Sequence, residues 1–144
     1  MADTRTNRSR PLLAPALGLL VAVGGLTGCG DAASEVVSAG DVEVLVAEPL
    51  GGVMDALLTG RLVVVDGCLG VEGEEAGDRM VVIWPHGTEV IDAAGPAIDV
   101  PGEGEIGIGD AVHVGGGAVD DGSGAGIEVP QPCRDSPLWL ASGS

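Results

Sequence analysis

The sequence predicts an all-β domain built as a small antiparallel barrel of five to six short strands. The 144-residue chain has no Phe and no Tyr, so Val, Ile and Leu must form its core together with two tryptophans. β-branched side chains favour strands, and the 26 glycines suit many tight turns and bulges. Short strands in a small domain must also hide their edges, which a closed sheet does most completely. A two-sheet β-sandwich is the second architecture.

The amino terminus has the pattern of a secretory signal. Residues 1–10 are polar and carry three arginines, and residues 11–25 carry no charge. A short apolar run after a basic flank is typical of a signal peptide. The run ends in Leu26-Thr27-Gly28-Cys29, which resembles the lipobox of bacterial lipoproteins. The resemblance implies cleavage before Cys29 and a diacylglyceryl group on its thiol.

The alternative is an uncleaved membrane helix over residues 11–30, which is about long enough to span a bilayer. Pro15 and the glycine pair at 24–25 make that segment a poor helix. Both interpretations place the rest of the chain outside the cytoplasmic membrane, because basic residues before an apolar segment stay inside. We therefore expect a signal peptide over residues 1–28, a lipidated Cys29 with a flexible tether over 29–41, and a β domain over 42–144.

The first half of the domain contains the clearest strand signals. A first strand is expected over residues 42–47, and a short helical turn over 53–58. Residues 60–71 predict a long strand bent at Gly67, and residues 79–84 predict a second strand that Pro85 stops. An acidic, turn-rich loop separates these two strands, which favours an antiparallel hairpin.

The second half has shorter segments. Short strands are expected over residues 89–92 and 97–100. A Gly109-Asp110 turn joins two alternating apolar stretches over residues 104–108 and 111–114.

After a glycine-rich loop, residues 127–129 predict a last strand, and the apolar patch 138–140 is expected to pack back on the barrel. This order of strands resembles an OB-type barrel.

Three short pieces in this order are similar to a group of small secreted or lipid-anchored bacterial domains without an established function. They are Asp66-Gly67-Cys68-Leu69, Val82-Ile83-Trp84-Pro85-His86-Gly87 and Val114-Gly115-Gly116-Gly117. The resemblance spans residues 60–140 and includes the late cysteine with its Trp-containing end. It supports the barrel and a Cys68–Cys133 bridge, and it implies no activity.

Lipidation of Cys29 leaves two cysteines, Cys68 and Cys133, in an oxidising compartment. A disulfide between them is the default interpretation. The alternative is a redox or metal pair, but metal sites cluster Cys and His at short spacing and no CxxC is present.

The charge of the mature chain is strongly negative. Three arginines stand against 21 acids after residue 28, a net charge of −18. Such a surface repels phosphate backbones, so nucleic acid is excluded as a partner class. The charge is compatible with cations and basic proteins as partners. The need to keep the domain soluble is sufficient by itself to explain a net charge of this size.

No pattern in the chain predicts a catalytic residue, a metal site or a cofactor. His86 and His113 have no second ligand at metal spacing. The acidic residues 72–78 and 120–121 lack the alternating acids of a calcium loop. The glycines at 115–117 are not followed by the lysine of a phosphate-binding loop.

The favoured function is therefore a lipid-anchored envelope protein whose non-catalytic barrel binds an envelope protein or cell-wall component, or acts structurally. The segment Trp84-Pro85-His86 is the expected interaction surface, because Trp is enriched at interfaces. The alternative is that Trp84 lies in the core. A carrier of a small ligand is the second hypothesis, although so small a barrel fills itself with side chains. An enzyme is the third, and a histidine paired with a carboxylate in a pocket would favour it.

Overall fold

The computed structural model describes residues 33–50, 54–75, 77–92 and 94–143. These residues form an all-β domain with one turn of 3₁₀ helix and one turn of α-helix. The strands are β1 (Glu35–Ala39), β2 (Val42–Val46), β3 (Ala56–Val65), β4 (Cys68–Glu72), β5 (Arg79–Trp84), β6 (Glu89–Asp92), β7 (Ala97–Val100), β8 (Gly104–Gly107), β9 (Ala111–Val119) and β10 (Leu138–Ala141), and the helices are η1 (Ser123–Ala125) and α1 (Gln131–Arg134).

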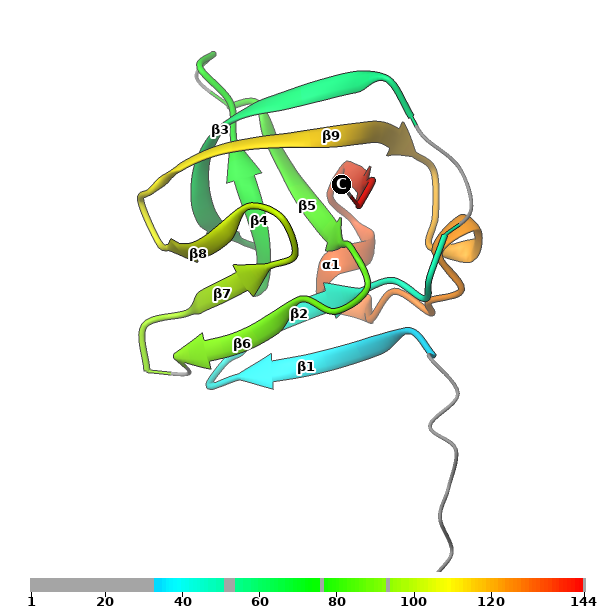
Figure 1. Cartoon of the computed structure of the whole chain (residues 1–144), viewed down its shortest axis with the longest axis horizontal. Coiled ribbons are helices and arrows are strands. Elements are labelled where there is room, and N and C mark those ends of the chain that lie inside the picture. Colours follow the sequence, from blue (N-terminus) through cyan, green and yellow to red (C-terminus); the bar gives the residue numbers. More distant parts are fainter. Residues whose placement is uncertain (1–32, 51–53, 76, 93, 144) are drawn as a thin grey trace, which may run out of the picture.

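Five strands close into a barrel, as the sequence predicts. Each strand pairs with the next in the order β4, β3, β9, β10 and β5, and β5 pairs back onto β4 (Figure 1). Followed around the ring from β3, the strands are β3, β4, β5, β10 and β9. These are the first, second, third, fifth and fourth barrel strands along the chain, which is the crossed arrangement of a Greek-key, OB-like barrel. The barrel is antiparallel except at one seam, where β10 runs parallel to β5.

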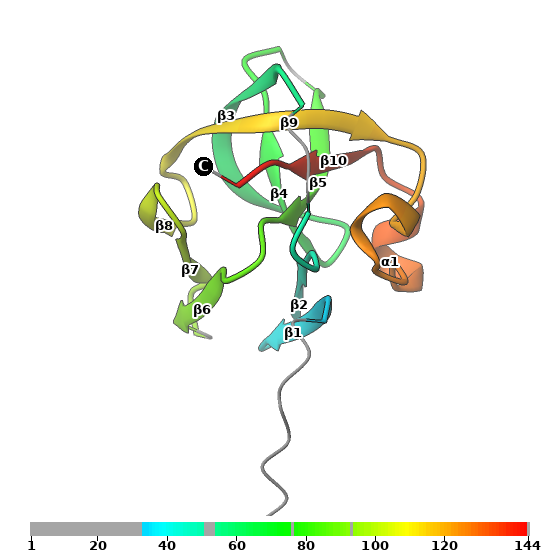
Figure 2. The same ribbon diagram turned by 45° about the vertical axis from the view of Figure 1, so that its right-hand side comes forward.

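Two additions flank the ring. The β1–β2 hairpin continues the sheet, because β2 pairs in parallel with the start of β4 and the end of β5. The strands β6, β7 and β8 form a separate antiparallel sheet. Figure 2 shows this small sheet and α1 on opposite sides of the barrel strands.

The inside and outside of the barrel follow from strand alternation. On β3 and β9, Arg61, Ala111 and His113 are exposed, so their side is the outside, whereas Leu62 and Val112 alternate with them and are buried. The buried residues on the inner side form one cluster that extends onto the β1–β2 hairpin and the small sheet. Its members are Leu58, Leu62, Leu69, Val71, Val82, Trp84, Val112, Val114, Trp139 and Ala141 from the barrel strands, Ala39, Val44 and Val46 from the hairpin, and Ile98, Val100 and Ile106 from the small sheet.

A second apolar cluster lies on the outer side of the same strands. It is covered by the segment between β9 and β10, which contains η1 and α1. Its buried members are Leu45, Ala47, Val65, Cys68, Val81, Ile83, Ala125, Ile127, Val129, Cys133, Leu138 and Leu140. The domain thus has a filled interior and a covered patch outside it.

The predicted tether over residues 29–41 is wrong in its second part, since Glu35–Ala39 form β1. Val37 packs against the inner cluster and Ala39 is buried in it, and β1 pairs along its full length with β2. The small and polar residues around this strand predict a tether. The strand forms because it pairs with the more apolar β2, and the local pattern of β1 does not reveal that partner. The predicted signal peptide and the predicted lipidation site Cys29 lie outside the described residues.

The predicted bend at Gly67 is a hairpin turn. Asp66 and Gly67 have φ values of 48° and 81°, and Val65 pairs with Cys68 across this two-residue loop. Positive φ at both central residues matches the right-handed twist of the flanking strands, and Asp-Gly is a preferred pair for it. The long strand 60–71 is therefore two antiparallel strands, β3 and β4.

Two further predictions of local structure differ from the observed fold. The helical turn over residues 53–58 is wrong, because β3 begins at Ala56 and pairs with β9 from there. The strand over residues 127–129 is also wrong, although Ile127 and Val129 are buried as apolar residues of a covering segment.

The patch 138–140 does pack back on the barrel, and it does so as the strand β10 that closes the ring. The predicted strands over residues 79–84, 89–92 and 97–100 are confirmed as β5, β6 and β7.

Candidate functional site

The predicted bridge between Cys68 and Cys133 is present, with the two Cα atoms 5.6 Å apart. It joins the start of β4 to α1, and so fixes the covering segment to the barrel. A second link lies beside it, where the Ser136 hydroxyl donates a hydrogen bond of 2.6 Å to the Asp66 carboxylate. The bridge is therefore a structural clamp over the outer cluster.

The predicted interaction surface Trp84-Pro85-His86 is wrong for its first two residues. Trp84 is 0% exposed within the inner cluster, and Pro85 is also buried. The Pro85 carbonyl accepts hydrogen bonds from the Thr88 backbone N–H and hydroxyl, which closes a tight turn. Only His86 of the three is exposed, so this segment is a core strand end followed by a turn.

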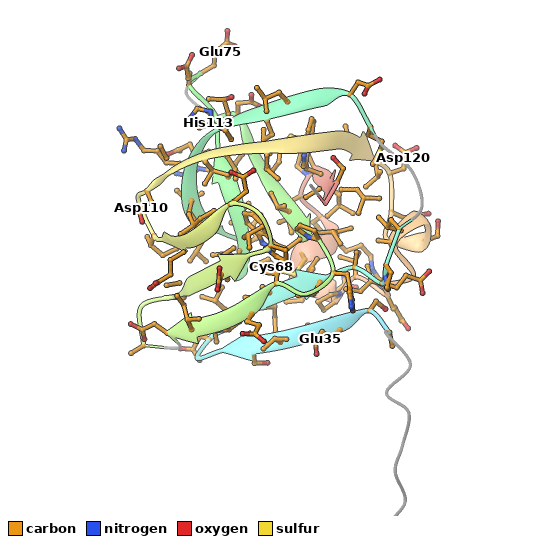
Figure 3. All side chains as sticks on the ribbon, in the orientation of Figure 1. Glu35, Cys68, Glu75, Asp110, His113 and Asp120 are labelled. Atoms are coloured by element: carbon orange, nitrogen blue, oxygen red, sulfur yellow. A yellow bond between two sulfur atoms is a disulfide. The ribbon has the colours of Figure 1, made fainter. Side chains whose placement is uncertain are left out.

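A polar hollow of about 390 Å³ lies on the outside of β4, β3 and β9. Its lining residues are Thr59, Gly60, Arg61, Glu72, Gly73, Glu74, Ala111 and His113. Strand register explains the grouping, because Arg61 lies opposite both Glu72 and Ala111, and Thr59 lies opposite His113. His113, which lines the hollow, lies toward one end of the molecule with Glu75, while Glu35 lies at the other end (Figure 3).

Three charged side chains around the polar hollow, those of Arg61, Glu72 and Arg79, have partners. The Arg79 Nε donates a hydrogen bond of 2.8 Å to Glu72 Oε1, and Arg61 Nη1 donates one of 3.0 Å to the Gly109 carbonyl. The ring of His113 lies 3.4 Å from the Thr59 hydroxyl through Nδ1. A histidine that acts as a general base is normally oriented by a carboxylate, whereas this ring is paired with a neutral hydroxyl.

A second hollow, here named the acidic groove, has a volume of about 410 Å³ on the outer side near η1 and α1. Its floor consists of Ile127, Val129 and Leu138, which belong to the outer cluster. Around the floor lie the polar side chains of Asp120, Asp121, Ser123, Glu128 and Arg134.

One carboxylate of the acidic groove is held in its charged form. The Ser123 hydroxyl and the Ser123 backbone N–H donate to Asp121 Oδ1 at 2.6 and 2.9 Å. These hydrogen bonds, the hydroxyl first, lower the pKa of Asp121 below its ordinary value of 3.8. Asp121 thus remains an anion throughout the physiological range.

Two features are absent from the described part of the chain. Within residues 33–50, 54–75, 77–92 and 94–143, no three His, Cys, Asp or Glu side chains are grouped closely enough to hold a metal ion. The same ranges contain no helix with the length and apolar character needed to cross a bilayer.

Comparison with known proteins found no matching family model, no matching curated protein and no matching solved structure.

In the sequence, residues 120–121 are an acidic pair without the pattern of a calcium loop, and no local pattern reveals the groove that they border. The floor of the groove comes from three separate positions, Ile127, Val129 and Leu138, which meet because the disulfide holds their segment against the barrel. The local signal was an apolar residue at every second position from 127, which is also the pattern of a strand.

Proposed function

We propose that the protein is a lipid-anchored envelope protein whose β domain is a non-catalytic module that binds an envelope protein or a cell-wall component through its outer surface. The observation that supports this best is the filled barrel. Trp84 and Trp139 occupy the interior with the aliphatic residues of the inner cluster, whereas the polar hollow and the acidic groove both open on the outside.

The filled interior disfavours the alternative of a small-ligand carrier. A barrel that carries a ligand needs space between its strands, and a five-stranded ring has little room beyond its own side chains. The carrier hypothesis would need a ligand on the outer surface instead.

The surface charge supports a partner that is basic or neutral. Of the 20 carboxylates in the described residues, 18 belong to exposed residues. Among all 20 carboxylates of the described residues, that of Glu72, which is half-buried, is the one in an ion pair. A surface with this excess of free anions repels acidic partners and steers basic ones.

The presence of a disulfide agrees with a domain outside the cytoplasm. Cystines persist in oxidising compartments and are rare in reducing ones. The lipobox Leu26-Thr27-Gly28-Cys29 supplies the membrane attachment in this proposal. Two acyl chains on one residue are expected to anchor the domain far more firmly than a single chain.

The intact mass of the protein purified from membranes tests the anchor. We expect a chain that starts at Cys29 with added acyl mass, and two thiols that react with alkylating reagent only after reduction. A Cys29→Ser variant is the matched control, since it keeps Cys68 and Cys133 but should lose the acyl mass. A chain that retains residues 1–28 without lipid would contradict the proposal.

Chemical crosslinking in native envelopes tests the binding role. A single recurrent partner captured by the wild type should be reduced in the Cys29→Ser variant, which is displaced from the membrane. A small molecule retained in native mass spectrometry, with no protein captured, would favour the carrier instead.

A further inference from the structure

The apolar floor of the acidic groove is accessible to a ligand, although its side chains are packed and mostly buried. Ile127, Val129 and Leu138 are 7%, 5% and 3% exposed, so each shows only an edge to the groove. A volume of about 410 Å³ lies within the roughly 300–1,000 Å³ that binding pockets span. The groove is therefore of a size to receive apolar side chains of a partner.

The loop that borders the groove is held by backbone hydrogen bonds. The Gly122 carbonyl accepts hydrogen bonds from the N–H groups of Ala125 and Ile127 at 3.0 and 3.1 Å. A side-chain carbon on Gly122 would overlap the Ile127 carbonyl, so this close approach requires glycine. A preorganised surface loses little conformational entropy when it binds.

The rim of the groove is negative overall. Asp120, Asp121 and Glu128 are all exposed, and the one cation, Arg134, uses its Nε and Nη2 to donate to the Val129 carbonyl at 3.2 and 2.9 Å. Three carboxylates around an apolar floor are complementary to a segment that carries both a positive charge and an aliphatic side chain. A second copy of this acidic chain is a poor occupant for the same reason.

The groove also lies beside the start of the domain. The Ser34 hydroxyl donates a hydrogen bond to the carbonyl of Gly126, a residue that lines the groove. Cys29 precedes Ser34 by five positions, a distance of about 18 Å when fully extended. Since a small domain is about 30 Å across, a lipid on Cys29 would keep this side of the barrel near the membrane and the polar hollow away from it.

We propose that the acidic groove docks a Lys- or Arg-bearing, leucine-containing extended segment of a partner protein at the membrane surface. The groove accepts the aliphatic side chain on its floor and the cationic side chains at its rim. Anionic lipid headgroups would attract the same basic segment from the other side. The position at the membrane rests on the proposed lipid anchor, whereas the chemistry of the groove does not.

The test uses the full-length lipoprotein in phosphatidylcholine nanodiscs, with its Ile, Leu and Val methyl groups labelled for NMR. Three acetylated, amidated peptides serve as probes, with the sequences Gly-Lys-Leu-Lys-Gly, Gly-Lys-Ser-Lys-Gly and Gly-Glu-Leu-Glu-Gly. We expect the Lys-Leu-Lys peptide to shift the methyl signals of Ile127, Val129 and Leu138. The Lys-Ser-Lys peptide should bind more weakly, and the acidic peptide should have no effect.

Two charge-matched variants show whether the rim or the net charge binds the peptide. Asp120→Asn with Glu128→Gln removes two rim charges and should weaken binding roughly three- to tenfold, as expected for two exposed ion pairs. Asp99→Asn with Glu105→Gln removes two exposed charges from the small sheet and should leave the affinity unchanged. Neither pair has a side-chain hydrogen bond among the described residues, so both variants should fold.

Equal weakening in the two variants would overturn the proposal, because general attraction to an acidic protein would then explain the binding. Shifts confined to residues away from the groove, or no shifts at all, would also overturn it. Magnetisation transfer from lipid chains to the Ile127 methyl would assign the groove to lipid instead. A failed mass test on Cys29 would remove the anchor and the membrane position while leaving the peptide result to decide the groove.

Discussion

The outer surface of the barrel differs sharply between its two ends, although the same strands run through both. On β3, Thr59 and Arg61 point outward into the polar hollow, while Val63 and Val65 point outward further along and join the outer cluster. The switch occurs where the segment between β9 and β10 begins to cover the strand. The uncovered stretch of β3 carries the polar side chains Thr59 and Arg61, whereas the covered stretch carries apolar ones, so a single strand has two kinds of outer surface.

The cover depends on a disulfide, while the uncovered end needs none. Cys133 anchors α1 to Cys68 on β4, and the chain then continues directly into β10. The polar hollow is instead organised by strand register and two charged hydrogen bonds. This difference leads to three predictions about where the domain is vulnerable.

The largest effect is expected inside the barrel. Trp84→Ala should lower the free energy of unfolding by about 3–5 kcal/mol, because it leaves a large cavity in a close-packed core. His113→Ala, on the uncovered outer side, should change it by less than about 0.5 kcal/mol. Urea denaturation monitored by circular dichroism measures both.

Trp84→Phe separates the volume of the ring from its N–H group. The Trp84 indole N–H is buried and has no hydrogen-bond partner among the described residues, so the loss of that N–H carries little penalty. We expect Trp84→Phe to cost much less than Trp84→Ala. Equal losses for the Phe and Ala variants would mean that the inner cluster does not depend on the volume of this ring.

The second effect concerns the cover. Replacing both Cys68 and Cys133 with Ala should destabilise the domain by at most about 4 kcal/mol, the chain-entropy value for a long loop; the two residues are 65 positions apart. Amide exchange should accelerate most over residues 120–141 and least along the β3–β9 pair. Uniform acceleration across the domain would contradict the idea of a separately clamped cover.

The smallest effect is a change in a pKa at the rim of the acidic groove. Ser123→Ala removes the hydroxyl that donates to Asp121, so the lowered pKa of Asp121 should rise toward 3.8. Because the folded pKa lies below the unfolded one, the stabilisation is present above the unfolded pKa and is lost as the pH falls through the folded value. Carbon-detected NMR titration of the Asp121 carboxyl group measures the change.

The Ser136→Ala variant is the control for this titration. Ser136 donates to Asp66 rather than to Asp121, so its removal should leave the Asp121 titration unchanged. If the pKa of Asp121 is the same in Ser123→Ala as in the wild type, the Ser123 hydroxyl is not the main cause of the lowered pKa.

Much of the candidate site could not be predicted from the sequence. The disulfide could be, because only two cysteines remain once Cys29 is assigned to the lipid. The exposure of His113 could also be, because it alternates with Val112 and Val114. Whether Trp84 lies at an interaction surface or in the core stayed open in the sequence, because nothing local reveals that it packs in one cluster with residues of the β1–β2 hairpin and the small sheet.

The sequence by itself determined the β class, the Gly109-Asp110 turn and the identity of the clamp. Its composition of Val, Ile, Leu and Gly, the Gly109-Asp110 pair and the cysteine count are local properties, and local physics is sufficient to interpret them. The antiparallel β4–β5 pair follows the predicted hairpin, but only the tertiary structure decided how the ring closes, that β10 lies beside β5, and that β1 is a strand at all. These features depend on contacts between residues distant in the chain, and a short segment has the same local pattern whether or not a distant partner is there to pair with it.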